Sequence, residues 1–315
     1  MRQGFNLVNN MDTKFCVGIG KLKLKNPVMV SSGTFGYAEE FKDFMDLRKL
    51  GAIVTKTITL KPRQGNPPPR TCETPAGMLN SIGLENPGLD IFIKDKFSYL
   101  KKLGVPVIVS VASEEEPEEF LELAARLNLI EEVAAIELNI SCPNVRGRES
   151  LISQDPEATF KIVQEVRKIT GKVLITKLSP NVTSISEIAK SAEAAGSDAV
   201  SLINTLSGMS IDIDKRKPKI AAGSGGLSGP AIRPVAVRMC WEVFNKVKIP
   251  IIGMGGITDT RSALEFIIAG ASAVSVGTAN FINPGVSVEI ISGLKEYLVK
   301  NKISSIKELV GTLKI

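Results

Sequence analysis

The sequence predicts an α/β protein built on a single (β/α)8 barrel, the TIM-barrel fold, with an N-terminal hairpin extension. A helical segment, a glycine and a short β-branched run recur in that order along the 315 residues. These runs are continuously apolar and do not alternate, which is typical of parallel strands buried on both faces. Eight such units follow one another without a linker or a break in composition, and a barrel of this kind takes about 250 residues or somewhat more.

Eight short apolar runs are the expected strands of the barrel. Glycines precede five of them, at Gly51, Gly104, Gly171, Gly196 and Gly270. A glycine suits the left-handed position that follows the last turn of a helix, because it has no Cβ atom to clash there. The expected strands cover residues 27–31, 52–55, 105–109, 135–140, 172–176, 198–203, 250–253 and 273–276.

Helical periodicity fills the gaps between these strands. Ser184-Ile-Ser-Glu187 is a capping-box pattern, which predicts the start of a helix. Residues 17–24 are expected to form a small hairpin and residues 1–14 a flexible tail, so that the whole chain, 1–315, is one domain. The other expected helices cover residues 118–127, 158–169, 233–247 and 261–269.

The composition is that of an ordinary globular protein, with 43% hydrophobic and 23% charged residues. The 39 basic residues are interleaved with 33 acidic ones and only 5% are aromatic, which predicts a solvated surface and no nucleic-acid partner. The longest apolar stretches, such as residues 106–112, fall far short of the ~20 residues that span a membrane. Residues 1–15 lack the apolar region of a signal peptide, so a cytoplasmic location is expected.

The chain contains no histidine. This excludes Ser-His-Asp and Cys-His hydrolase sites and zinc sites with histidine ligands. The four cysteines, Cys16, Cys72, Cys142 and Cys240, show no C-x-x-C spacing, so we expect no metal site and no iron–sulfur cluster on this chain. A general base must then be Cys, Lys, Tyr, Asp or Glu.

Residues at the carboxyl ends of the strands are the candidates for chemistry, because active sites of such barrels lie there. The sequence places two lysines and one thiol at these ends, among amide and hydroxyl side chains. Glycine-rich segments follow the last two strands, at residues 253–259 and 277–278, where barrels commonly bind phosphate through backbone N–H groups. A third glycine-rich run, residues 223–229, is expected to contribute further backbone N–H donors to the same phosphate group.

The most specific motif is Asn139-Ile-Ser-Cys-Pro-Asn144. With it, the chain resembles the class 1 dihydroorotate dehydrogenases over nearly its whole length. Residues 65–70 and 80–86 favour class 1B, whose catalytic subunit works with a second, electron-transferring subunit. The other matching motifs are Ser31-Ser-Gly-Thr-Phe-Gly36, Asn80-Ser-Ile-Gly-Leu-Glu-Asn-Pro-Gly88, Lys177-Leu-Ser-Pro-Asn181, Ile203-Asn-Thr205, Gly225-Gly-Leu-Ser-Gly-Pro230 and Gly270-Ala-Ser-Ala-Val-Ser-Val-Gly-Thr-Ala-Asn280.

The resemblance implies an FMN-dependent oxidation of dihydroorotate to orotate in pyrimidine biosynthesis. A hydride passes to FMN and a proton to Cys142, whose thiolate is a suitable base in a chain without histidine. Lys56 bridges the substrate carboxylate and the flavin, and Lys177 stabilises the anionic reduced ring at its N1–O2 edge. Electrons then reach NAD through a partner subunit with FAD and a 2Fe–2S cluster, in a heterotetramer containing a homodimer of this chain.

The same resemblance implies two sets of ligands. The polar loop of residues 143–150 closes over the substrate in the family, with Gly147 as a hinge. Ser110 departs from the family, which usually has Asn there, and this puts one contact to flavin or substrate in doubt. The substrate-binding set is Lys56, Asn80, Ser81, Ile82, Gly83, Leu84, Asn139, Asn144, Asn204 and Thr205. The FMN-binding set is Ser32, Lys56, Thr57, Asn139, Lys177, Ile203, Gly229, Gly255, Gly256, Gly277 and Thr278.

Three other functions remain open at this point. A class 1A enzyme would use fumarate as acceptor without a partner. A dihydrouridine synthase shares the barrel, FMN and a cysteine, but needs a C-terminal helical RNA-binding domain that we do not expect after residue 315. A phosphate-binding barrel isomerase or synthase would carry no flavin, and its preparation would not be yellow.

Overall fold

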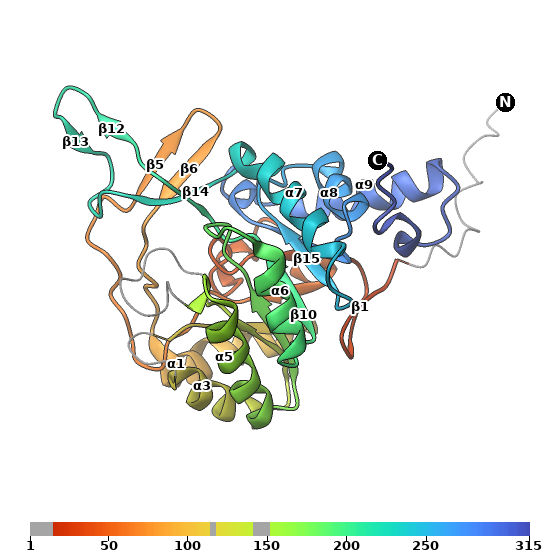
Figure 1. Cartoon of the computed structure of the whole chain (residues 1–315), viewed down its shortest axis with the longest axis horizontal. Coiled ribbons are helices and arrows are strands. Elements are labelled where there is room, and N and C mark those ends of the chain that lie inside the picture. Colours follow the sequence, from red (N-terminus) through yellow and green to blue (C-terminus); the bar gives the residue numbers. More distant parts are fainter. Residues whose placement is uncertain (1–14, 114–117, 141–151) are drawn as a thin grey trace.

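A computed structural model describes residues 15–113, 118–140 and 152–315 of the chain. Its centre is a closed barrel of eight parallel strands in the order β10-β15-β16-β3-β4-β7-β8-β9 (Figure 1). The barrel strands are β3 (Val28–Val30), β4 (Ala52–Val54), β7 (Val107–Val111), β8 (Val133–Leu138), β9 (Val173–Lys177), β10 (Ala199–Leu202), β15 (Ile251–Met254) and β16 (Ala273–Val276). Each of the eight expected runs overlaps one of these strands, so the predicted (β/α)8 barrel is confirmed.

Helices surround the barrel and bury the outer faces of its strands. This two-sided burial explains why the strands are continuously apolar: all five residues of β7 are buried, for example. After β3 and β4 the connections differ, with short 3-10 turns at Glu39–Phe41 and Leu47–Lys49 and a composite helical segment from Gly88 to Leu103. The larger helices are α3 (Glu119–Asn128), α5 (Pro156–Ile169), α6 (Ile185–Ala194), α7 (Arg233–Phe244), α8 (Thr260–Ile268) and α9 (Val286–Lys300).

The composite segment after β4 consists of α1 (Gly88–Ile91), a π-helical turn (Phe92–Lys96), α2 (Phe97–Leu100) and a 3-10 turn (Lys101–Leu103). A last 3-10 turn, Ile306–Leu309, follows α9. None of the helices in the described part of the chain combines the length and apolarity that a membrane crossing requires.

The predicted capping box at Ser184 is wrong. Ser184 does precede the first residue of α6, but its hydroxyl makes no capping hydrogen bond and lies 3.2 Å from Ser186 Oγ. A complete capping box starts α8 instead, where Asp259 Oδ1 accepts from Ser262 N at 2.7 Å and Ser262 Oγ accepts from Asp259 N at 2.9 Å. The sequence pattern at α6 was suitable, but the hydroxyl has a nearer side-chain partner.

The expected left-handed glycines are confirmed at Gly104, Gly196 and Gly270, whose φ angles are 66°, 98° and 120°. Gly51 and Gly171 are not in this region, so the prediction is wrong for them. At Gly51 the requirement is space: a Cβ atom there would lie 2.3 Å from the carbonyl oxygen of Asn26.

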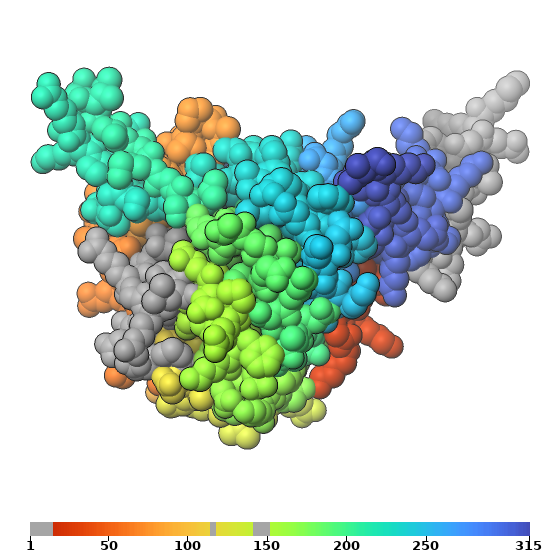
Figure 2. Space-filling model, viewed as in Figure 1, coloured from red at the N-terminus to blue at the C-terminus, as the bar shows by residue number. Residues whose placement is uncertain are grey.

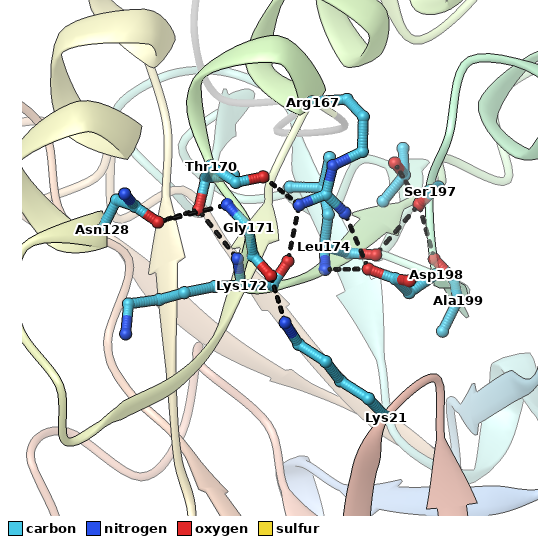
Figure 3. Close-up of polar contacts among 11 residues, drawn as sticks. Lys21, Asn128, Arg167, Thr170, Gly171, Lys172, Leu174, Ser197, Asp198 and Ala199 are labelled. Carbon is cyan, nitrogen blue, oxygen red and sulfur yellow. Dashed lines mark hydrogen bonds and ion pairs between the residues drawn. The ribbon is translucent and has the colours of Figure 1, made fainter.

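The expected N-terminal hairpin is present as β1 (Val17–Ile19) and β2 (Leu22–Leu24), paired antiparallel. Figure 3 shows how it is attached to the amino-terminal end of the barrel, where Lys21 Nζ donates to the carbonyl oxygen of Gly171. In the same cluster Asp198 accepts from Arg167 Nη1 and from Leu174 N, both at 2.8 Å. The predicted tail, residues 1–14, lies outside the described residues.

A four-stranded antiparallel sheet, which the sequence analysis did not predict, stands beside the carboxyl ends of the barrel strands. Its order is β11-β14-β6-β5, with β5 and β6 from the segment after β4 and with β11 and β14 from the segment after β10. Between β11 and β14 a small hairpin extends outward, and Figure 2 shows this protrusion beside the β5–β6 turn. The strands are β5 (Thr71–Thr74), β6 (Gly77–Asn80), β11 (Leu206–Gly208), β12 (Ile211–Asp212), β13 (Lys217–Pro218) and β14 (Gly225–Ser228).

Candidate active site

A cavity opens at the carboxyl ends of the barrel strands, the end at which barrels of this type carry their chemistry. Segments that follow six of the barrel strands line it, and the antiparallel sheet closes one side. The lining residues are Ser31, Ser32, Gly33, Thr34, Lys56, Thr57, Asn80, Ile82, Gly83, Leu84, Glu85, Asn139, Lys177, Ile203, Asn204, Thr205, Ser228, Gly229, Ile232, Met254, Gly255, Gly256, Gly277 and Thr278.

The cavity brings together nearly all the ligands expected from the sequence. All eleven expected FMN ligands line it, and so do eight of the ten expected substrate ligands: Lys56, Asn80, Ile82, Gly83, Leu84, Asn139, Asn204 and Thr205. Ser81 is not a lining residue; it is fully buried, and its hydroxyl has no hydrogen-bond partner among the described residues. Cys142 and Asn144 lie outside the described residues.

Lys56 follows β4 and is half-buried at the cavity wall. Burial lowers the pKa of its ammonium group below the ordinary value of 10.5, and the nearby positive charge of Arg70 acts in the same direction. The carboxylates of Glu85 and Glu40 oppose this shift in the pKa. Lys56 therefore offers an anionic ligand a poorly solvated cation, as expected from the sequence.

Lys177 ends β9 and is almost completely buried, with 6% of its surface exposed. Its Nζ donates to Ser32 Oγ at 3.2 Å and lies 3.9 Å from Glu137 Oε1. Glu137 was not singled out from the sequence, although a carboxylate inside the apolar run of β8 is a signal that could have identified it.

A chain of polar side chains at the cavity wall links the ends of four strands, β10, β8, β4 and β7. Asn204 Nδ2 donates to Asn139 Oδ1 at 3.4 Å, and Asn139 Nδ2 donates to Thr57 Oγ1 at 3.1 Å. Thr57 Oγ1 lies 3.0 Å from Ser110 Oγ, and Ser110 is fully buried. Ser110 thus supports Thr57 and contributes no side chain to the cavity.

The glycine-rich loops meet at one end of the cavity. Gly255 and Gly256 have φ angles of 122° and 76°, in the region that favours glycine. A Cβ atom on Gly256 would lie 2.8 Å from the carbonyl oxygen of Gly229, so the close approach of these two loops needs glycine. Thr278 Oγ1 donates to Ser228 Oγ at 2.8 Å, which joins the loop after β16 to β14. Such a small-residue cradle suits a phosphate group.

Several lining residues were not among the expected ligands. Ser31, Gly33 and Thr34 adjoin the expected Ser32, and their position directly after β3 was a usable signal. Glu85 and Ile232 enter the cavity from segments whose path depends on the antiparallel sheet and on α7, so the strand pattern gave no indication of them.

Comparisons with known proteins point to one family. The family model described as dihydroorotate dehydrogenase matches residues 14–298. A curated relative from Trichlorobacter lovleyi, described as dihydroorotate dehydrogenase B (NAD(+)), catalytic subunit, is 53% identical over 303 residues, which is 96% of this chain and 99% of the relative. A relative from Geotalea daltonii with the same description is 53% identical over 299 residues, covering 95% of this chain and 98% of the relative.

A solved structure supports the fold. The dihydroorotate dehydrogenase of Eimeria tenella, crystallised in complex with ferulenol, superposes with a TM-score of 0.79. It is 22% identical and covers 98% of this chain and 91% of its own.

Proposed function

Because the chain belongs to the dihydroorotate dehydrogenase family, we propose that it oxidises dihydroorotate to orotate in pyrimidine biosynthesis, with FMN as its cofactor and NAD as the final acceptor. The observation that carries this proposal is the cavity, which joins a glycine cradle at one end to two poorly solvated lysines, Lys56 and Lys177. The relatives are described as NAD-linked enzymes, which favours NAD over the fumarate-linked alternative.

The residues present fit FMN. The loops at Gly255–Gly256 and Gly277–Thr278 would hold its phosphate, since backbone N–H groups and small residues accommodate an anion. Lys177 would lie near the ring and supply positive charge. When bound, FMN supplies the hydride acceptor for the reaction.

The other part of the cavity suits a small planar anion rich in hydrogen-bonding groups. Lys56 would bind the carboxylate of dihydroorotate, and the amides of Asn80, Asn139 and Asn204 would bind its ring. The backbone N–H of Thr205 donates to Asn204 Oδ1 at 2.7 Å, so Asn204 presents its Nδ2 to Asn139 Oδ1, and Asn139 Nδ2 is left to face Thr57.

Proton removal is assigned to Cys142, with Asn144 as a further substrate ligand. Both assignments rest on the sequence motif, since these residues lie outside the described part of the chain. A thiolate is a competent base near neutral pH if its pKa is lowered by its surroundings.

The partner is a second subunit that carries FAD and a 2Fe–2S cluster, in a heterotetramer with two copies of this chain. The relatives are described as catalytic subunits of an NAD-linked enzyme, which supports a separate electron-transferring subunit. The sequence has no Rossmann G-x-G-x-x-G pattern of its own to bind NAD.

The test uses the purified chain under anaerobic conditions. We expect about one FMN per chain and loss of the flavin absorbance when dihydroorotate is added. Lys56→Gln should retain FMN but need much more dihydroorotate for the same bleaching, whereas the exposed control Lys49→Gln should behave as the parent. A chain without flavin, or a flavin that dihydroorotate leaves oxidised, would overturn the proposal.

A further inference from the structure

A buried carboxylate lies below the cavity and has no role in the function proposed above. Glu137 belongs to β8 and is 1% exposed, while the other residues of this strand are apolar. Asn139, two positions further on, lines the cavity. Since side chains two apart in a strand point to the same side, Glu137 occupies the layer of the barrel interior below Asn139.

The carboxylate of Glu137 has two polar neighbours. Ser201 Oγ on β10 donates to Oε2 at 2.9 Å. Oε1 has no hydrogen-bond partner within the described residues, and Lys177 Nζ lies 3.9 Å from it. The strand register explains why these three side chains lie close together. β9 lies between β8 and β10, and Lys177 is paired with Ser201.

Lys177 lines the cavity, whereas Glu137 does not. The ammonium group is therefore available to a ligand from the cavity and is in contact with a carboxylate in the interior. A buried carboxylate is costly unless it is paired, and the 3.9 Å separation shows an ion pair without a close hydrogen bond.

We propose that Glu137 is a positioning residue of the redox site: it holds the Lys177 ammonium, offsets part of its charge, and thereby lowers the midpoint potential of FMN bound in the cavity. The inference rests on the proposed function, since it takes FMN as the occupant. Dihydroorotate gives up a hydride to FMN and a proton to the base, so bound FMN gains two electrons, one proton and one net negative charge.

The opposite charges of Lys177 and Glu137 affect how readily reduced FMN gives up its electrons. An unopposed ammonium group beside FMN would favour the negatively charged, reduced cofactor. The carboxylate of Glu137 opposes this effect, so electrons leave the cofactor more readily for the next acceptor.

The experiment measures the midpoint potential of FMN bound to the full chain carrying Glu137→Gln. Glutamine keeps the volume and can still accept from Ser201, but it removes the charge. One buried charge at ~10 Å and an effective dielectric constant of ~20 changes the ratio of reduced to oxidised cofactor on the order of tenfold. The potential should therefore rise by about 30 mV, the value of a tenfold change for a two-electron couple.

Two variants serve as matched comparisons. Ser201→Ala removes the hydrogen bond to Glu137 but leaves both charges, so the ratio should change by less than about threefold. Lys177→Gln removes the positive charge and should shift the potential in the opposite direction. The dissociation constant of FMN, measured from flavin fluorescence, is a second readout and should not weaken in Glu137→Gln.

An unchanged or lower potential in Glu137→Gln overturns the inference, and so does a folded variant that has lost FMN. If this variant does not fold, Glu137→Asp decides, because its shorter carboxylate is withdrawn from Lys177 and should give a smaller rise; no rise overturns the inference. A parent chain without FMN would instead overturn the proposed function, which keeps the two failures distinct.

Discussion

Lys56 carries its charge at a position that water reaches poorly. Because burial lowers its pKa below 10.5, the ammonium form that binds a carboxylate is lost at a lower pH than for an ordinary lysine. We expect the binding of orotate to weaken as the pH rises through this lowered pKa. The measurement is a titration of the FMN-loaded chain with orotate, followed by flavin absorbance between pH ~7 and ~10.

Lys56→Arg is the control for this pH dependence, because a guanidinium group stays charged throughout the range. Its affinity for orotate should lack the alkaline decline, even if it is lower overall. An equal decline in the parent and in Lys56→Arg would show that another group is responsible.

Cys142 allows a second prediction at the scale of one residue, based on the sequence motif. A serine hydroxyl is far less acidic than a thiol, so Cys142→Ser should reduce FMN about 10²- to 10⁴-fold more slowly at neutral pH. The rate should recover partly at alkaline pH, and FMN should remain bound. Stopped-flow absorbance measures this rate, and the exposed Cys16→Ser is the control; a parental rate in Cys142→Ser at pH 7 would contradict the assignment.

The sequence alone identified those cavity residues that lie at the end of a strand or directly after it. Lys56 and Lys177 follow strands directly, so their position was readable. Ser81 was predicted as a substrate ligand; it is fully buried and does not line the cavity, whereas its neighbours Asn80 and Ile82 do. Glu137 was missed because its importance depends on Lys177, which lies on the adjacent strand.

Helix caps give a prediction at the scale of one element. Asp259 closes a complete capping box at α8, whereas Ser184 makes no capping hydrogen bond at α6. Asp259→Ala should lower the free energy of unfolding by about 1 kcal/mol, and Ser184→Ala should change it by less than ~0.5 kcal/mol. Urea unfolding compares the two, and equal losses would contradict the difference between the caps.

The hydrogen bonds of Asp198 at the amino-terminal end of the barrel give a second prediction at the scale of one element. Asp198→Ala removes the carboxylate that accepts from Leu174 N and from Arg167 Nη1, although Arg167 keeps the carbonyl groups of Thr170 and Lys172 as acceptors. The loss of the acceptor for the buried backbone N–H should cost about 1–3 kcal/mol of the free energy of unfolding. The exposed Asp214→Ala is the control and should be nearly neutral. The affinity for FMN should not change in either variant, since Asp198 lies at the opposite end of the barrel from the cavity; a selective loss of FMN would contradict this separation.

The barrel strands could be predicted because burial on both faces produces continuous apolar runs. The antiparallel sheet could not, because its strands are short and the pairing that joins its two halves, β6 with β14, spans a long distance in the chain. Asn80 on β6 pairs with Gly226 on β14, and no local pattern specifies such a pairing.

At the scale of the whole molecule, the chain should be unable to use NAD without a partner. Dihydroorotate should bleach its FMN in one turnover, because the cavity provides for one cofactor and one substrate. Reoxidation by NAD should be negligible, while an artificial dye should restore turnover. Stopped-flow mixing of the lone chain tests this, and rapid NAD reduction would contradict the need for an electron-transferring subunit.

The long-range pairing of β6 with β14 also has a consequence for folding during synthesis on the ribosome. Asn80 leaves the ribosome long before Gly226 is made, and at ~5–20 residues per second the interval is on the order of ten seconds. The loops at Gly255 and Gly277 emerge later still. Capture of the cofactor must therefore follow synthesis of nearly the whole chain, and a nascent chain that stalls earlier has no finished cradle in which to hold it.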